Sequence, residues 1–274
     1  MIVLRPGSGL CNRLRAMGSA IKLACELGVD LRVEWFRCPI RRWAGLCGMR
    51  VGFGDLFEPI PEVPVAEKII VRNDLPWNFL KWSRHNRNFY GEERRAEFVK
   101  DMKAAPGTSR WIRTCFPFYS TPDFSWVRPK PRIMDRINAF SRVFGDHCIG
   151  VHIRRTDNRA AIDGSPLSLF EEKMDEEIRQ DDQVRFFVST DDASVKDDLR
   201  RKYGDRVLFC EDVASRYTRK GEEDAVVDLM LLSRTRKIYG SYWSSFSEVA
   251  AGITGVPLEI LIKAGVALPE WERS

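Results

Sequence analysis

The sequence lacks the features that mark a membrane span, a disulfide framework or a zinc site. No apolar run approaches the roughly 18 residues that a membrane-spanning helix needs. The 7 cysteines are an odd number, they are scattered, and no two form a C-x-x-C pair. This pattern argues against structural disulfides and against a zinc site, and it fits free thiols in a reducing compartment.

The start of the chain also lacks a signal-peptide pattern. Residues 1–5, Met-Ile-Val-Leu-Arg, have the character of a strand from the first position onward. We therefore expect a cytoplasmic protein without a transmembrane segment. A peripheral association with membranes stays open.

The composition is ordinary for a globular protein, but the charge is unevenly distributed. Hydrophobic residues make up 44% of the 274 residues, which is enough for a core in one large or two smaller domains. Residues 1–150 contain 25 Lys and Arg against 15 Asp and Glu, whereas the remainder contains 19 against 24. A basic excess can indicate nucleic-acid binding. Here it is dispersed among acids and accompanies no recognisable module, so we expect no nucleic-acid partner.

The first half begins with a β-loop-α-β pattern. A strand is predicted over residues 2–5, and apolar residues at helical spacing predict a helix from about Asn12 to residue 27. A second strand follows over residues 31–35. Between the first strand and the helix lies a glycine-rich loop that includes Gly9. Such a loop lets the backbone approach a ligand closely and directs the N–H groups of a helix N-terminus at it.

Residues 38–130 give a weaker pattern of short strands, prolines and loops. Residues 77–95 interleave aromatic and basic side chains, which can stack on sugars or bases. The alternative is that the aromatic residues are the buried face of an irregular segment. Residues 128–131, Arg-Pro-Lys-Pro, resemble a linker. We place a domain boundary there, with an acceptor-side domain over residues 1–130 and a second domain over residues 131–274.

The second half predicts a further α/β series. Strands are expected over residues 148–153, 184–190, 207–210 and 237–240, with helices between them. Ser165-Pro166 fits an N-cap followed by proline at the first helical position.

Charged residues follow the buried strand at 148–153 in the string His152-Ile-Arg154-Arg155-Thr-Asp157. Ligands in an open α/β sheet lie at the carboxyl ends of the strands. An arginine fork matches the oxygens of a phosphate. Because neighbours on an extended chain point to opposite sides, we expect Arg154 to face the ligand with His152. Arg155 is then expected to pair with Asp157 or another carboxylate and to hold the loop. The alternative is a solvated pair of arginines.

Two further strand ends carry polar residues. Thr190, Asp191 and Asp192 follow one strand, and either carboxylate could accept from the N1–H and N2–H₂ edge of guanine or could cap the next helix. The string Ser244-Ser245-Phe246-Ser247 places hydroxyls at a helix N-terminus, where they can bind phosphate or cap the helix.

Four of these strings resemble motifs of the fucosyltransferase clan. The string from His152 to Asp157 is similar to the His-x-Arg-Arg-x-Asp signature of α1,6-fucosyltransferases. The opening Gly-x-Gly9-Leu-x-Asn12-Arg13-Leu and the Ser-Ser-Phe-Ser string resemble other regions of the same clan, which includes rhizobial chitin-oligosaccharide and protein O-fucosyltransferases. The Thr-Asp-Asp string resembles a segment of α1,6-fucosyltransferases. The first half between residues 38 and 130 carries no such motif.

The resemblance implies an α/β protein of the glycosyltransferase B type, with two Rossmann-like domains across a cleft and a shortened first domain. It implies a GDP-sugar donor, contacted by Gly9, Asn12, Arg13 and the three strand-end strings, and a glycan or oligosaccharide acceptor. The implied reaction is an inverting transfer of fucose from GDP-fucose, with Arg154 and Arg155 acting on the diphosphate.

The residues indicate no metal and no cofactor besides the donor. No Asp-x-Asp follows a strand, and the arginines can replace a divalent cation. Some relatives carry a glutamate about ten residues after the signature histidine. Ile162 stands there in this chain, so the neighbouring Asp163 is the candidate base. Two alternatives remain, namely a transferase that uses another GDP-sugar and a non-catalytic nucleotide- or glycan-binding protein.

Overall fold

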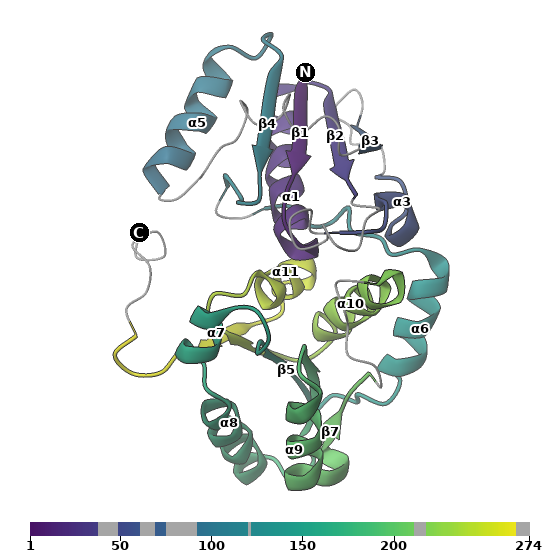
Figure 1. Cartoon of the computed structure of the whole chain (residues 1–274), viewed down its shortest axis with the longest axis vertical. Helices are drawn as coiled ribbons and strands as arrows, with labels where there is room; N and C mark the ends of the chain where they lie inside the picture. Colours follow the sequence, from purple (N-terminus) through teal and green to yellow (C-terminus); the bar gives the residue numbers. More distant parts are fainter. Residues whose placement is uncertain (38–48, 61–68, 75–91, 120–121, 211–217, 267–274) are drawn as a thin grey trace. The chain divides into compact units, whose positions relative to one another are not determined.

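The computed structural model describes residues 1–37, 49–60, 69–74, 92–119, 122–210 and 218–266 (Figure 1). These residues form two α/β units. Those between 1 and 130 and from 218 to 222 belong to the first unit, and those from 131 to 210 and 223 to 266 belong to the second. Within the described ranges all strands pair in parallel in two sheets, apart from one isolated antiparallel bridge, so the predicted α/β class with Rossmann-like sheets is confirmed.

The division after residue 130 lies at the predicted linker, but the start of helix α10 (Arg219–Leu232) groups with the first unit. Glu222 joins this part of the chain to the first unit, because its buried carboxylate accepts hydrogen bonds from the backbone N–H groups of Arg50 at 2.8 Å and Val51 at 2.9 Å.

The first sheet has the strand order β3-β2-β1-β4. In chain order its described elements are β1 (Ile2–Pro6), α1 (Leu10–Leu27), β2 (Leu31–Phe36), α3 (Phe53–Leu56), β3 (Ile69–Asp74), α5 (Glu92–Ala104) and β4 (Arg110–Thr114). Leu14, Met17 and Ile21 recur at helical spacing along α1 and are buried, as the sequence predicted. The helix starts earlier than predicted, because Gly9 is its N-cap and Asn12 lies inside the first turn.

The second sheet has the strand order β7-β6-β5-β8-β9. In chain order the described elements are α6 (Pro131–Ser141), β5 (Cys148–Ile153), α7 (Arg159–Gly164), α8 (Leu167–Gln180), β6 (Arg185–Thr190), α9 (Ala193–Tyr203), the 3₁₀ turn η3 (Gly204–Arg206), β7 (Val207–Leu208), α10, β8 (Ile238–Ser241), α11 (Ser245–Thr254) and β9 (Leu258–Leu261). The predicted strands recur here, whereas α7 and β9 were not predicted.

Alternation along β5 separates two faces of this sheet. Ile149, Val151 and Ile153 lie in the hydrophobic core that also contains residues of α8 and α9. Gly150 and His152 lie on the other face, where α10 and α11 pack (Figure 1). A Cβ on Gly150 would stand 2.7 Å from the side-chain oxygen of Thr235, so this close approach requires glycine.

Ser165 differs from its predicted role as the N-cap of α8. The N-cap is Pro166, and Ser165 instead ends α7. Its fully buried hydroxyl donates to the carbonyl of Leu261 at 2.5 Å and accepts from the backbone N–H of Tyr242 at 2.7 Å. The hydroxyl therefore joins α7 to the region after β8, a tertiary role that a local pattern does not predict.

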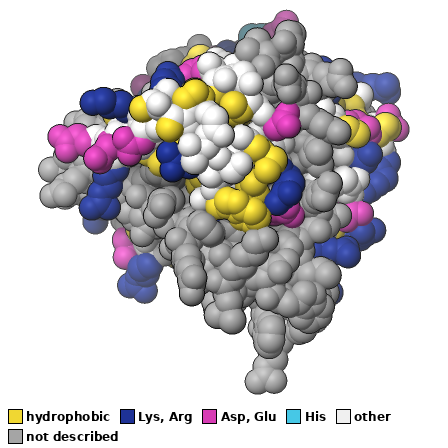
Figure 2. Space-filling view, turned by 90° about the horizontal axis from the view of Figure 1, so that it is seen from above, with side chains coloured by type: hydrophobic (Ala, Val, Ile, Leu, Met, Phe, Trp, Pro, Cys, Tyr) yellow, Lys and Arg dark blue, Asp and Glu magenta, His cyan; other side chains and the backbone are white. Residues whose placement is uncertain are grey.

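The surface of the first unit at which its strands begin is shown from above in Figure 2, where Lys and Arg side chains (dark blue) lie around the margin of the described surface. Among the helices of the described ranges, none combines the length and the apolar character that a membrane span requires. The cysteines of these ranges are free thiols. Most of the aromatic and basic stretch at 77–95 lies outside the described residues.

Candidate functional site

The candidate site lies at the switch point of the second sheet. From the central strand β5 the chain proceeds to β6 and β7 on one side, whereas β8 and β9 lie on the other. In open α/β sheets ligands bind where the strand order reverses, at the carboxyl ends. The backbone N–H of Arg154 donates to the Ser241 hydroxyl at 2.9 Å, and that hydroxyl donates to the carbonyl of His152 at 3.1 Å. One serine thus fastens the ends of β5 and β8 together.

Asp191 clamps the loop that follows β5. One carboxylate oxygen accepts from the backbone N–H of Arg155 at 2.7 Å. The other accepts from the Thr156 hydroxyl at 2.6 Å and lies 3.1 Å from Nε of Arg154. Burial raises the pKa of Asp191, but the Arg154 guanidinium and the hydrogen bonds from Thr156 and Arg155 outweigh it and leave the pKa below its ordinary value. Both oxygens are therefore engaged within the protein.

The other two residues of this predicted string also make local contacts. Asp192 caps α9 by accepting from the backbone N–H of Ser194 at 2.9 Å and from its hydroxyl at 2.7 Å. The Thr190 hydroxyl is buried and accepts from the backbone N–H of Asp192 at 3.3 Å. The capping alternative thus accounts for Asp192, and the string leaves no carboxylate obviously directed at a base.

The two arginines after β5 have different environments. Arg154 pairs with Asp191 and Asp157, and its side chain is 22% exposed. Arg155 donates from Nη1 to the carbonyl of Arg154 at 3.2 Å and from Nη2 to that of Ser165 at 2.7 Å. Burial lowers the pKa of Arg155, while Asp191 and Asp192 raise it.

The expected pairing of Asp157 with Arg155 is therefore wrong, because Asp157 pairs with Arg154. Strand β5 ends at Ile153 and the chain bends directly afterwards, so strand alternation no longer governs where the two arginines point. Arg155 still holds the loop, but through carbonyl groups. Both arginines are partly exposed at the switch point.

His152 is buried on the α11 side of the sheet. Its ring stacks on Phe246, with centroids 4.9 Å apart and an interplanar angle of 24°. Burial and the nearby Arg154 lower the pKa of His152 to about 3, against the opposing effect of Asp191. The imidazole is therefore neutral at physiological pH. Its Nδ1 is buried without a hydrogen-bond partner within the described part of the chain.

Asp228 on α10 is a candidate that the sequence reasoning missed. One oxygen of its buried carboxylate accepts from the Ser189 hydroxyl at 2.8 Å, and the other, Oδ1, has no hydrogen-bond partner among the described residues. Burial raises the pKa of Asp228, against the lowering effects of Cys210 and Ser189. The available signal was a lone aspartate within the apolar run 226–232, a pattern typical of a core helix.

His152 and Asp228 belong to the same site. Ser189, which binds Asp228, is the register partner of His152 on the neighbouring strand. Buried polar atoms are nearly always hydrogen-bonded in native proteins. Two unpartnered atoms on one face of the sheet, Nδ1 of His152 and Oδ1 of Asp228, therefore indicate a place where a polar ligand or water completes the hydrogen bonding.

The serine-rich string begins α11 as predicted, but its hydroxyls differ in accessibility. Ser244 is the N-cap and makes no side-chain capping bond, and Ser245 is the first helical residue. Ser247 is fully buried, and a Cβ on Gly240 would stand 2.4 Å from its hydroxyl oxygen. Ser247 therefore packs against β8, and only the first two serines have the position of phosphate-binding residues.

The first unit uses its predicted residues internally. Arg13 is fully buried, donates from Nε to the carbonyl of Ser8 at 2.9 Å and lies 4.8 Å from the centroid of the Trp35 ring. Tertiary packing thus buries the Arg13 side chain, and its contact with the donor stays a prediction. The Asn12 amide donates to the hydroxyl of Ser8 at 3.0 Å. The loop residue Gly9 caps α1 with an extended backbone.

Asp163, the candidate base, lies on the surface and not among the buried polar groups of the site. Asp163 lies on α7 with its side chain 63% exposed, and it pairs with Arg159 at 3.0 Å. Its role remains a prediction. Within the described ranges, no group of three or more His, Cys, Asp or Glu side chains is arranged to hold a metal ion.

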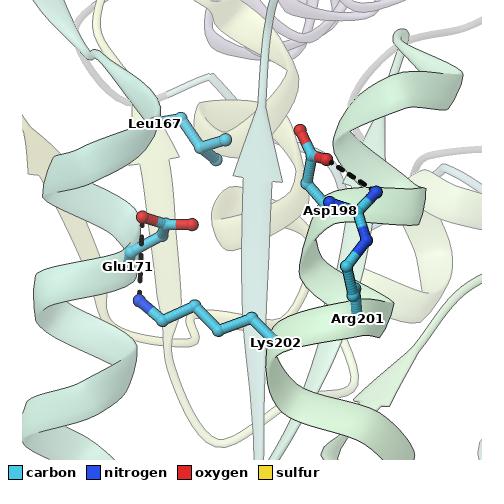
Figure 3. Close-up of a pocket in the computed structure, with 5 residues that line it drawn as sticks. All are labelled: Leu167, Glu171, Asp198, Arg201 and Lys202. Atoms are coloured by element: carbon cyan, nitrogen blue, oxygen red, sulfur yellow. Dashed lines mark ion pairs between the residues drawn. The ribbon is translucent and has the colours of Figure 1, made fainter.

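A surface groove between α8 and α9 has a volume of about 430 Å³ (Figure 3). It is lined by Leu167, Glu171, Asp198, Arg201 and Lys202. Lys202 pairs with Glu171 at 3.7 Å, and Arg201 with Asp198 at 3.3 Å. These helices cover the opposite face of the sheet from His152 and Asp228, so the groove is separate from the candidate site.

The sequence matches no family model and no curated protein. Its fold, however, matches solved fucosyltransferase structures. NodZ α-1,6-fucosyltransferase soaked with GDP-fucose is 20% identical with a TM-score of 0.62, and the match covers 94% of this chain and 93% of that one. NodZ from Bradyrhizobium is 21% identical with a TM-score of 0.60, over 91% and 90% of the two chains.

More distant similarity extends to two other fucosyltransferase structures. A variant of Arabidopsis thaliana FUT1 in complex with GDP is 14% identical with a TM-score of 0.60, over 95% of this chain and 69% of that one. POFUT1 in complex with GDP is 12% identical with a TM-score of 0.57, over 97% and 98%. The chain thus has a fucosyltransferase-like fold of the glycosyltransferase B type.

Proposed function

We propose that this protein transfers fucose from GDP-fucose to a hydroxyl group of a glycan or another acceptor, with inversion and without a divalent metal. The observation that carries the proposal is the position of Arg154, a partly exposed cation at the switch point of the second sheet, fixed by Asp191 at 3.1 Å. The fold similarity supports it, since the matched structures include NodZ soaked with GDP-fucose and POFUT1 with GDP.

In the proposed reaction the acceptor oxygen attacks C1 of fucose from the face opposite the diphosphate. The bond between C1 and the β-phosphate oxygen breaks, GDP leaves with the bonding electrons, and the acceptor hydroxyl releases its proton to a base. Negative charge grows on the diphosphate as the bond breaks. A preorganised cation such as Arg154 stabilises that charge more in the transition state than in the ground state.

The residues around Arg154 suit a diphosphate. Arg154 forms ion pairs with Asp191 through Nε and with Asp157 through Nη2, and these carboxylates orient the guanidinium plane. The N-terminus of α11, with Ser244 and Ser245, adds backbone N–H groups and a favourable dipole. Together these groups can neutralise a diphosphate without a metal ion, which is the basis for proposing metal independence.

We propose that a residue other than the predicted Asp191 or Asp192 recognises the guanine base. Asp191 and Asp192 are occupied by the loop and by α9, whereas Oδ1 of Asp228 is a buried acceptor without a partner among the described residues. A carboxylate can accept from the N1–H and N2–H₂ groups of guanine, a donor pair that adenine does not offer. His152, neutral and buried, can supply one further hydrogen bond through Nδ1.

Calorimetry with GDP, ADP and UDP tests this proposal. The wild type should prefer GDP, and Asp228→Asn should lose about 1.5–3 kcal/mol of GDP affinity, because an amide cannot accept both donors. Asp198→Asn, a change in the groove between α8 and α9, is the matched control and should bind GDP normally. Equal binding of the three nucleotides would reject guanine recognition. GDP binding without any hydrolysis of GDP-fucose would favour a non-catalytic binding protein.

A further inference from the structure

Trp243 stands out on the surface of the second unit. Among the described residues, the large hydrophobic side chains that are exposed are those of Met1, Val143 and Trp243, and Trp243 is 41% exposed. Large aromatic residues are usually buried, since they carry much apolar area. An exposed tryptophan near a candidate site therefore needs an explanation.

The backbone of Trp243 is strained. Its φ of 55° lies in the left-handed region, which a bulky side chain rarely adopts. Two hydrogen bonds fix this conformation. The amide of Asn158 donates to the carbonyl of Trp243 at 2.7 Å, and the Ser165 hydroxyl accepts from the backbone N–H of Tyr242 at 2.7 Å. Strain that the surrounding structure maintains is typical of functional positions.

The strained residue lies within the turn that joins β8 to α11. Ser241, two residues earlier, binds the backbone of Arg154, and Ser244, the next residue, is the N-cap of α11. Asn158, which holds the carbonyl of Trp243, follows the loop of Arg154 directly and caps α7. The indole therefore belongs to the same turn as the groups that suit a diphosphate.

We propose that Trp243 is a stacking platform for the hexose ring that the donor diphosphate carries, an inference that rests on the proposed function. A pyranose ring has a face rich in C–H groups, which carry partial positive charge, and the indole face is negative. A sugar attached to the β-phosphate at Arg154 and Ser244 is the part of the donor that extends beyond the diphosphate. The exposed indole offers it an apolar surface.

Three variants test this assignment. Trp243→Gly removes the ring and also relieves the left-handed strain, Trp243→Phe keeps an aromatic face, and Val143→Ala is the matched control at an exposed apolar residue after α6. For each variant we would measure the Kd of GDP by calorimetry, KM and kcat for GDP-fucose hydrolysis, and Tm.

For Trp243→Gly we expect KM for GDP-fucose to rise about tenfold, as for the loss of one stacked ring, with the Kd of GDP within about twofold of wild type. Its Tm should not fall, because the strain is removed. In Trp243→Phe, KM for GDP-fucose should stay close to the wild-type value, because an aromatic face remains. Val143→Ala should match the wild type in all four quantities.

An unchanged KM in Trp243→Gly would contradict the proposal that Trp243 stacks on the sugar. So would a rise in the Kd of GDP as large as the rise in KM for GDP-fucose. A lower Tm together with weaker GDP binding would identify a structural role instead. If the wild type itself does not bind GDP, the proposed function fails and this inference fails with it. Intact GDP binding with unaffected KM in the variant rejects this inference alone.

Discussion

The two units each carry an arginine in the segment that follows the first strand of a parallel sheet, but the two side chains have different environments. Arg13 lies in the first turns of α1, whereas Arg154 directly follows β5. Arg13 in the first unit is fully buried, and its guanidinium binds the carbonyl groups of Ser8 and Phe36. Arg154 in the second unit keeps part of its guanidinium exposed and is oriented by carboxylates. The contrast is the basis for proposing Arg154, and not Arg13, as the cation that binds the diphosphate.

The strongest test of this contrast is Arg154→Ala. We expect kcat to fall by about 100-fold or more, because a preorganised donor to the leaving diphosphate is lost. Arg154→Lys keeps the charge without the planar fork and should fall in between. Steady-state kinetics of GDP-fucose hydrolysis and calorimetry with GDP would show whether kcat falls far more than affinity. Near-normal kcat in Arg154→Ala, with loss of activity in Arg155→Ala, would reverse the assignment of the two arginines.

Arg13→Ala should lower the stability of the protein and not its affinity for GDP. Removing a fully buried guanidinium leaves the carbonyl of Ser8 unpaired and a cavity beside Trp35, so we expect a loss of about 3 kcal/mol in unfolding free energy. Urea denaturation measures this loss. Arg159→Ala, where the side chain is 88% exposed, is the control and should change stability little. In Arg13→Lys the GDP affinity of the folded protein should be unchanged, and a selective loss of GDP binding would restore Arg13 to the site.

The buried His152 predicts a pH dependence for the stability of the second unit. Its pKa of about 3 in the folded protein lies below the ordinary 6.5. Above pH 6.5 the imidazole is neutral in both states, and stability is at its full value. As the pH falls from 6.5 toward 3, the imidazole of His152 is protonated in the unfolded chain but stays neutral in the folded protein. The free energy of unfolding therefore falls by up to about 1.4 kcal/mol per pH unit.

Urea unfolding of the wild type and of His152→Gln between pH 4 and 7 checks this prediction. The variant should show a shallower pH dependence, whatever its stability at neutral pH. Val143→Ala, which changes an exposed apolar residue without a titratable group, should leave the slope close to that of the wild type. Identical slopes in the wild type and His152→Gln would mean that the imidazole is not held neutral.

The smallest expected effect is that of metal removal. If arginine supplies the charge at the diphosphate, GDP-fucose hydrolysis in excess EDTA should equal hydrolysis in Mg²⁺. A loss of turnover that Mg²⁺ or Mn²⁺ restores would contradict the cationic role of Arg154. Turnover of GDP-fucose without chelator is the matched reference.

The local sequence pattern correctly predicted the features that depend on a single strand and on the residues that follow it. The run 148–153 is a fully buried strand, and the charged string after it lies at a switch point, as strand-end chemistry suggested. The serine string likewise begins α11. These features depend on periodicity and capping, which a single sequence carries.

The missed features depend on tertiary contacts. Asp228 seemed part of an apolar helix, and only the pairing with Ser189 shows that its second oxygen lacks a partner among the described residues. Arg13 belongs to a motif-like string, yet the packing of Trp35 decides its burial. Strand β9 is short and bears the exposed Glu259 at the edge of the sheet, so it lacks the apolar run that identifies a buried strand.

The order of the first sheet has a consequence for how the chain folds during synthesis. Strand β1 lies between β2 and β4, and its register pairs Ile2 with Arg110 and Pro6 with Thr114. One side of β1 therefore has no strand to pair with until more than a hundred residues have left the ribosome. Such non-local pairing slows folding and leaves an unpaired strand edge open to aggregation in the meantime.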